Sequence, residues 1–142
     1  MKPIGVIRTP FKDKRSAPIQ PVKSKAEGRV VLLKKYEEGL DDIEGFSHII
    51  LLYIFNRTRG YRLKVKPYRD NRLRGVFATR HNRRPNRIGL SVVKLIKRRG
   101  NVLYIKNIDA LDRTPLIDIK PYVPEFEPGV KVRVGWRKKL KE

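Results

Sequence analysis

The stretch "TRHNRRPNRIGLS", Thr79 to Ser91, concentrates side chains that bind polyanions. It contains four arginines: Arg80, Arg83, Arg84 and Arg87. Guanidinium groups bind phosphates in a bidentate manner and stack on bases, although arginine runs on a basic protein fit a solvated loop equally well. Asn82, Pro85 and Asn86 add a fixed φ and amide donors and acceptors, which a loop needed only for solubility does not require. We therefore predict a loop that binds phosphates or bases.

A second segment, "NIDALDRTPLIDIKPY", gathers carboxylates that are scarce elsewhere. It holds three of the 14 acidic residues: Asp109, Asp112 and Asp118. Three roles fit this cluster, namely balancing local positive charge, capping turns through Asp112 and Thr114, and binding a cationic ligand. The spacing alone favours the turn-capping interpretation.

The composition sets the class of partner. The chain has 142 residues with 35 Lys and Arg against 14 Asp and Glu, a net charge of +21, which predicts a polyanionic partner. No long amphipathic helix is apparent, so nucleic acid ranks above an anionic membrane surface. With no cysteine and two histidines, neither a disulfide scaffold nor a metal site is expected.

The N-terminus and the apolar runs point to a soluble protein. Residues 1–10 lack the continuous apolar stretch of a signal peptide. The longest apolar run, residues 49–55, is far too short to span a bilayer. A cytoplasmic location is therefore expected. No glycine-rich nucleotide motif of the Rossmann or P-loop type is present.

Short alternating or β-branched runs separated by turn residues predict the fold. Strands are expected at residues 2–10, 29–36, 47–56, 62–68, 88–97, 102–109 and 130–136. The strand at 47–56 is expected to be buried on both faces, and Gly100 and Asn101 are expected to turn a hairpin in left-handed conformations. Residues 11–28 read as a long loop and 37–46 as a helical turn or loop. Together they predict a mainly β fold: a single antiparallel β-barrel domain over residues 1–142, with long loops and little helix.

The aromatic residues and one histidine allow two interpretations. Tyr36, Tyr53, Phe55 and Tyr104 either pack inside the barrel or stack on a base at its mouth. The sequence does not separate these two roles. His48 lies in the apolar run "FSHIILLYIF" and is interpreted as a core histidine without a catalytic role.

Two long segments carry a family resemblance. "GVFATRHNRRPNRIGLSVVKL" (Gly75 to Leu95) and "LDRTPLIDIKPYVP" (Leu111 to Pro124) together resemble the paired signature of the TsaA-like family, also called TrmO or YaeB. That signature has the form FATR…RPN.IG.S followed by D.LDGTP..DIKPY. "PIGVIRTPFK", "PIQP" (Pro18 to Pro21) and "GFSHIILLYIF" match further family blocks in the same order, so the resemblance spans nearly the whole chain.

The resemblance implies a methyltransferase that uses S-adenosyl-L-methionine and modifies tRNA, built on an antiparallel β-barrel and working as a homodimer. It is similar to enzymes that methylate the exocyclic amino nitrogen of threonylcarbamoyl-adenosine beside the anticodon of a threonine tRNA. The family's cofactor pocket maps onto the following positions: Pro18, Gln20, Phe55, Asn56, Arg80, Leu90, Leu111, Asp112, Arg113 and Thr114. Two departures bear on the shape of that pocket, because the family usually has proline at position 87 and glycine at position 113. Glycine often serves a positive φ or a close backbone approach, and the replacement by Arg113 is expected to lose one or the other.

The implied chemistry requires few acid or base residues. Methyl transfer from a sulfonium is an in-line displacement that depends mainly on positioning, with a modest need for proton removal. Asn86 and Asp109 are the expected catalytic residues, and a carboxylate there offsets the surrounding arginines near a cationic sulfonium. The anticodon loop is the expected RNA partner because its bases are already single-stranded.

Five arginines are expected to contact RNA phosphates: Arg83, Arg84, Arg87, Arg98 and Arg99. Two alternatives remain open from the sequence. One is a basic β-barrel that binds RNA without methyltransferase activity, and the other is a related methyltransferase that acts on a small molecule or another RNA.

Overall fold

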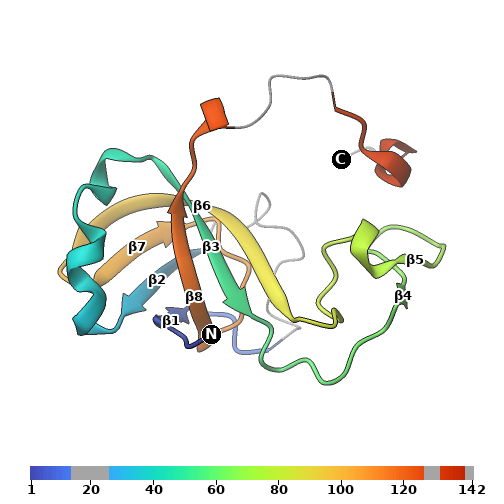
Figure 1. The fold of residues 1–142 in the computed structure, drawn as a ribbon, viewed down its shortest axis with the longest axis horizontal. Coiled ribbons are helices and arrows are strands. Elements are labelled where there is room, and N and C mark those ends of the chain that lie inside the picture. Colours follow the sequence, from blue (N-terminus) through green and yellow to red (C-terminus); the bar gives the residue numbers. More distant parts are fainter. Residues whose placement is uncertain (14–25, 127–131, 140–142) are drawn as a thin grey trace.

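Six strands close into an antiparallel β-barrel. The structure, a computed structural model, describes residues 1–13, 26–126 and 132–139. The barrel strands are β1 (Gly5–Arg8), β2 (Glu27–Leu32), β3 (His48–Ile54), β6 (Ile88–Arg99), β7 (Val102–Lys106) and β8 (Thr114–Pro121). They follow the order β1-β2-β7-β6-β3-β8 around the barrel, and β8 returns to β1 (Figure 1). The expected mainly β fold with a single antiparallel barrel is confirmed.

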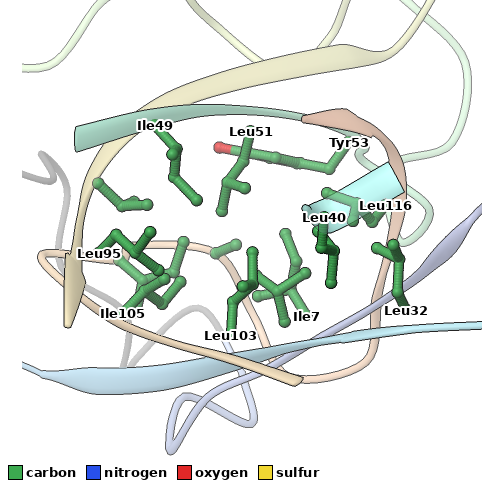
Figure 2. Packing of buried hydrophobic residues seen from close by; sticks show 14 residues of the cluster. Ile7, Leu32, Leu40, Ile49, Leu51, Tyr53, Leu95, Leu103, Ile105 and Leu116 are labelled. Atoms are coloured by element: carbon green, nitrogen blue, oxygen red, sulfur yellow. The ribbon is translucent and has the colours of Figure 1, made fainter. Parts of the chain in front are cut away.

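The barrel interior is a packed apolar core. Along β3 the side chains of Ile49, Leu51 and Tyr53 are buried in it, and the side chains between them are only half-buried (Figure 2). The expectation that this strand is buried on both faces is therefore wrong. Successive side chains of a strand point to opposite faces, and in this barrel only one face of β3 meets the core.

The β6–β7 hairpin has a two-residue turn. Arg99 pairs with Val102, which leaves Gly100 and Asn101 between the strands. Gly100 has a φ of +59°, but Asn101 is not in the positive-φ region, so the expected left-handed conformation is wrong for Asn101. A positive φ at the first central residue alone is typical of a type II′ turn. The Asn101 side chain instead donates a 2.6 Å hydrogen bond to the Leu32 carbonyl and ties the turn to β2.

Two of the expected strands differ from the structure because no further barrel strand pairs with them: one is shorter than expected, and the other does not form over its described residues. The strand expected at residues 29–36 is β2, which stops at Leu32, and a 3-10 helix, η2 (Lys34–Leu40), follows it. The helical turn expected at 37–46 is confirmed by η2 and by η3 (Ile43–Gly45). The last expected strand is wrong over its described residues, since 132–134 carry no strand and η6 (Gly135–Lys139) follows. The barrel is already closed by the β1–β8 pair and has no free edge for it.

A long excursion leaves the barrel between β3 and β6. We call residues 57–87 the β4–β5 excursion, after its small two-stranded sheet of β4 (Lys64–Val65) and β5 (Arg74–Gly75), which η4 (Val76–Ala78) follows. The exposed strand expected at 62–68 is thus reduced to two residues. Figure 1 shows the excursion projecting from the barrel, with η6 beside it. Trp136 of η6 donates its indole N–H to the Ala78 carbonyl at 2.8 Å, and the Arg74 guanidinium lies 5.4 Å from its ring centre.

Within the described part of the chain, no helix is long and apolar enough to cross a membrane.

Candidate functional site

Residues from both signature segments meet at one end of the barrel. β3 ends there, β6 begins there, and the segment between β7 and β8 contacts β6 there through Asp109. Tyr53 of β3 lies opposite Gly89 of β6 in the register and beside Leu116 of β8. Ser91 of β6 contacts Asp109, which precedes β8. Segments about eighteen or more positions apart in the sequence are therefore joined by side-chain contacts at this end.

Three of these residues form a hydrogen-bonded row, which we call the Tyr53–Ser91–Asp109 triad. The Tyr53 hydroxyl lies 2.7 Å from Ser91 Oγ, and Ser91 Oγ donates a 2.9 Å hydrogen bond to Asp109 Oδ1. Ser91 has one proton, which goes to the carboxylate, so the tyrosine is the donor to the serine. Tyr53 is 4% exposed and Ser91 is 1% exposed, whereas Asp109 is half-buried. The row thus leads from the barrel core to a partly accessible carboxylate.

Burial changes the proton affinity of both ends of the triad. Burial, and secondarily the Asp109 carboxylate, raise the pKa of Tyr53 well above its usual value, so the phenol stays protonated and remains a donor. Burial also raises the pKa of Asp109, and the hydrogen bond from Ser91 opposes part of that rise. A carboxylate with a raised pKa is a better proton acceptor than an exposed one.

Asp112 is held inside a network with the N-terminal strand. Its carboxylate accepts a 2.8 Å hydrogen bond from Arg8 Nε and a 3.0 Å bond from the Thr9 backbone N–H. Burial alone would raise the pKa of Asp112, but these hydrogen bonds and the nearby positive charge of Arg8 outweigh it and lower the pKa. Thr114 donates to the Leu111 carbonyl at 2.7 Å, so the turn-capping interpretation fits Thr114, whereas the hydrogen bonds of the Asp112 carboxylate join it to Arg8 and Thr9. A cofactor contact of Asp112 stays a prediction.

The backbone at Arg113 keeps the conformation that glycine would supply. Its φ is +66°, and its backbone N–H donates to the Ile7 carbonyl at 2.9 Å. The expected loss of positive φ is therefore wrong, because the close pairing of β1 and β8 holds the arginine there. The Arg113 side chain is exposed, and the backbone at this position has the left-handed conformation.

The other expected cofactor residues differ in how they relate to the triad. Phe55 packs edge-on against Tyr53, with ring centres 5.6 Å apart, and is half-buried. Leu90 and Arg80 are exposed, and the positive charge of Arg80 opposes part of the rise in the Tyr53 pKa. Asn56 is also exposed, on the backbone that follows β3. Pro18 and Gln20 lie outside the described residues.

Three of the arginines expected to bind RNA also donate hydrogen bonds to backbone carbonyls of the excursion. The guanidinium of Arg83 donates to the Arg59 carbonyl at 3.1 Å. That of Arg84 donates to the Thr79 and His81 carbonyls at 2.7 and 3.2 Å. Arg87 donates to the Thr58 carbonyl. A guanidinium has five N–H donors, so each retains others for a phosphate.

The five arginines do not lie on one surface. Arg98 and Arg99 are at the far end of the twelve-residue strand β6, about 35–40 Å of strand from Arg87. Arg98 is 3.5 Å from Asp41 and 3.7 Å from Glu44 and donates to the Gly100 carbonyl. An arginine already paired with two carboxylates is poorly suited to bind phosphate, so only the excursion arginines and the triad share one end of the barrel.

The two expected catalytic residues differ in their surroundings. Asp109 is anchored by Ser91, whereas Asn86 is exposed on the loop before β6. Asn86 accepts the Ile88 N–H through its backbone carbonyl at 2.8 Å. In the described residues no hydrogen bond joins Asn86 to Asp109, so a shared role stays a prediction.

Tyr53 and Ser91 were not identified as site residues from the sequence. One signal was available for Ser91, because it occupies an inward position of an alternating strand whose next inward residues, Val93 and Leu95, are apolar. A hydroxyl at such a position needs a buried partner. That partner follows β7 and is not adjacent in the sequence, so only the structure identifies it.

These features define a basic, closed antiparallel β-barrel with a polar site at one end and an arginine-rich excursion beside it. The family model described as the tRNA-methyltransferase O N-terminal domain matches residues 6–128. The chain therefore belongs to this family, which confirms the resemblance found in the sequence.

Individual relatives support the same assignment. The chain is 52% identical over 139 residues to a probable S-adenosyl-L-methionine-binding protein of Pyrococcus abyssi, covering 97% of this chain and 76% of that protein. It is 42% identical over 136 residues to the tRNA (adenine(37)-N6)-methyltransferase of Escherichia coli, covering 87% of this chain and 57% of that enzyme.

A solved structure agrees in fold. The crystal structure of TrmO from Pseudomonas aeruginosa superposes with a TM-score of 0.78 at 38% identity, covering 95% of this chain and 60% of that chain. The present chain thus spans a little over half of the length of this structure and of the Escherichia coli enzyme.

Proposed function

We propose that this protein is a methyltransferase that uses S-adenosyl-L-methionine to methylate the exocyclic amino group of an adenosine beside the anticodon of tRNA. The adenosine is proposed to carry the threonylcarbamoyl group, and the protein to work as a cytoplasmic homodimer. One observation carries the proposal: Ser91 of the first signature segment is hydrogen-bonded to Asp109, next to the second segment. The names of the Escherichia coli and Pyrococcus abyssi relatives support the reaction and the cofactor.

The residues present fit the cofactor. A sulfonium-bearing adenosine needs an apolar surface for its base, a cation for its carboxylate and a carboxylate near its positive charge. Phe55 and Leu90 offer partly exposed apolar surface, Arg80 is an exposed cation, and Asp109 supplies the carboxylate. When bound, the cofactor supplies the methyl group in an electrophilic form.

The β4–β5 excursion fits the RNA. Its residues 57–87 include ten arginines and two lysines but one carboxylate, Asp70, which is already paired with Arg74 at 2.7 Å. About half of the net charge of +21 is therefore concentrated beside the triad. Such a surface attracts the phosphate backbone and holds the anticodon loop close to the barrel end.

The side chains have distinct roles in this proposal. Arg83, Arg84 and Arg87 shape the loop through backbone carbonyls and direct their remaining donors to phosphates. Asn86, exposed on the same loop, orients the adenosine through its amide. Asp109 accepts the proton that leaves the amino nitrogen.

Calorimetric titration with S-adenosyl-L-methionine, followed by a methylation assay on tRNA, tests the proposal. We expect micromolar binding, about −8 kcal/mol, and transfer of one methyl group per tRNA. Transfer should be lost with a tRNA whose target adenosine is replaced by guanosine. Binding of tRNA without any binding of the cofactor, with or without tRNA present, would refute the proposal and support the RNA-binding alternative.

A further inference from the structure

The buried hydroxyl groups of Tyr53 and Ser91 lie in an otherwise apolar barrel. The other inward side chains of these two strands include Ile49, Leu51 and Val93, all fully buried. Burying a hydroxyl without a hydrogen bond is costly, and an apolar residue would fill either position without that cost. Both hydroxyls are satisfied within the triad alone. The two hydroxyls therefore form a hydrogen-bonded chain that ends at the Asp109 carboxylate.

The packing around Tyr53 fixes the direction in which its hydroxyl points. Gly89 lies directly across from it on β6, and a side chain at Gly89 would overlap the rings of Tyr53 and Phe55. Phe55 meets the Tyr53 ring edge-on at an angle of 84°. The phenol is thus held against Ser91, and Ser91 is held against one oxygen of Asp109.

We infer that Tyr53 and Ser91 are positioning residues that orient the Asp109 carboxylate as the proton acceptor of the methyl transfer. Asp109 is the catalytic residue, and the two hydroxyls act through it. The inference rests on the proposed function and deepens it, since it assigns to two barrel residues a part in the same reaction.

The step balances as follows. The amino nitrogen forms a bond to the methyl carbon while the bond between that carbon and sulfur breaks, and its electron pair stays on sulfur. The proton of the nitrogen passes to the Asp109 oxygen that Ser91 does not occupy. Ser91 keeps its own proton, and Tyr53 keeps its phenol proton. The carboxylic acid later releases its proton to solvent, which restores the starting state.

Burial and two hydrogen bonds control the protonation of Asp109 within the described part of the chain. Ser91 and the backbone N–H of Asp109 itself are hydrogen-bonded to its carboxylate and favour the ionised form. The charged groups that act on Tyr53 are Asp109 and Arg80. The Ser91 hydrogen bond lowers the pKa of Asp109 and so counteracts the effect of burial. Without the Ser91 hydroxyl, the pKa of Asp109 must therefore rise further. Asp109 works as a base only when ionised, so the acidic limb of the activity profile must move to higher pH in S91A.

The experiment compares S91A, Y53F and D109N with two matched controls. S47A removes a serine hydroxyl that is hydrogen-bonded to His48, and Y104F removes a tyrosine hydroxyl from β7 outside the triad. The readouts are kcat and KM for tRNA, the Kd for S-adenosyl-L-methionine, kcat against pH, and the titration of the Asp109 carboxyl by ¹³C NMR.

We expect D109N to lose about 10²-fold or more in kcat, S91A about tenfold, and Y53F less than S91A. The Kd for the cofactor should stay within about twofold of wild type in S91A and Y53F. The Asp109 titration and the acidic limb should both move to higher pH in S91A, and by less in Y53F. S47A and Y104F should behave as wild type.

Unchanged kcat in S91A and Y53F, or an Asp109 titration that does not move, would overturn the inference. A weakened cofactor Kd with kcat intact would also overturn it and assign the triad to cofactor binding. If the wild-type protein methylates no tRNA, the proposed function fails instead. The NMR titration still decides whether the hydroxyls control Asp109, because it requires folded protein but no turnover.

Discussion

Arg8 and Asp112 join the first strand of the barrel to the turn before the last one, with Arg8 Nε donating to Asp112 Oδ1 at 2.8 Å. The two residues are more than a hundred positions apart in the sequence. The side chain of Asp112 is nearly buried, whereas that of Arg8 is 42% exposed. This contact holds the β1–β8 seam, where the barrel closes and where Arg113 takes its unusual conformation.

Replacement of Asp112 by asparagine should lower the free energy of unfolding by an amount that depends on pH. The variant keeps the shape but loses the charge, and we expect the free energy of unfolding to fall by about 1–2 kcal/mol at pH 7, since Arg8 is partly screened by solvent. The folded-state pKa of Asp112 is below its ordinary value of 3.8. Its contribution is therefore complete above that value and is lost as the pH falls through the folded pKa.

Urea unfolding of the wild type and D112N between pH 2.5 and 7 measures this difference. The gap between the two proteins should be constant near neutrality and should close in acid. Asp118, whose carboxylate contacts the exposed Lys120 and the Ile119 backbone, gives a matched control, and D118N should change stability by less than about 0.5 kcal/mol. A gap that persists unchanged at the lowest pH would exclude the ion pair as its cause.

The backbone of Arg113 offers a second test. Its φ of +66° is strained for arginine and relaxed for glycine. Arg113→Gly relieves that strain, which stabilises the fold, but it also makes the unfolded chain more flexible, which destabilises the fold. The two effects oppose each other, so the free energy of unfolding should stay within about 1 kcal/mol of wild type. Arg113→Val should destabilise by about 1–2 kcal/mol, because a β-branched residue tolerates this region least. Thermal denaturation of both variants measures the difference, and a valine variant as stable as the glycine variant would contradict the strain.

The sequence predicted a barrel because most of its strands alternate and are separated by turn residues. It did not predict β8, whose segment includes Pro115 and Pro121, and it did not identify the ends of the strands. Leu32 and Leu33 are equally apolar, and β2 stops between them because no paired strand continues beyond this point. The strand expected at residues 130–136 does not form over its described residues for the same reason, because the closed barrel has no free edge with which it could pair.

The site was predictable only in part. Asp109 and the arginines of the excursion stood out by charge and by motif. The triad did not, because hydrogen bonds between Tyr53, Ser91 and Asp109 depend on how three separate segments meet. The separation of Arg98 from Arg87 was likewise invisible, because it follows from the length of β6 and not from residue type.

Gly89 should tolerate no side chain. A Cβ there would overlap the Tyr53 and Phe55 rings, so Gly89→Ala is expected to destabilise by about 1–3 kcal/mol and to lower activity by displacing Tyr53 from Ser91. Among the described residues, no atom lies within 4 Å of the position of a Cβ added at Gly45, so Gly45→Ala should lie within about 0.5 kcal/mol of wild type. Denaturant unfolding and initial methylation rates measure both effects. If Gly89→Ala had wild-type stability, the Tyr53 and Phe55 rings would not pack against Gly89 as closely as the structure shows.

Arg84 tests whether the excursion binds tRNA through charge alone. Its guanidinium donates to the Thr79 and His81 carbonyls and lies 5.8 Å from the centre of the Phe77 ring. Arg84→Lys keeps the charge but loses the planar fork, so we expect tRNA binding to weaken by about tenfold, roughly 1.4 kcal/mol. The slope of log affinity against log salt should stay nearly unchanged, because the number of cations is unchanged.

Two further variants complete this test. Arg84→Ala removes the charge as well, and the salt slope should fall in magnitude by about one. Arg99→Lys, at the exposed far end of β6, should bind tRNA as the wild type does. Filter binding of tRNA from 50 to 300 mM salt measures all four proteins. Wild-type affinity in Arg84→Lys together with a loss in Arg84→Ala would mean that a point charge suffices at this position. The carbonyl contacts of Arg84 would then have no part in tRNA recognition.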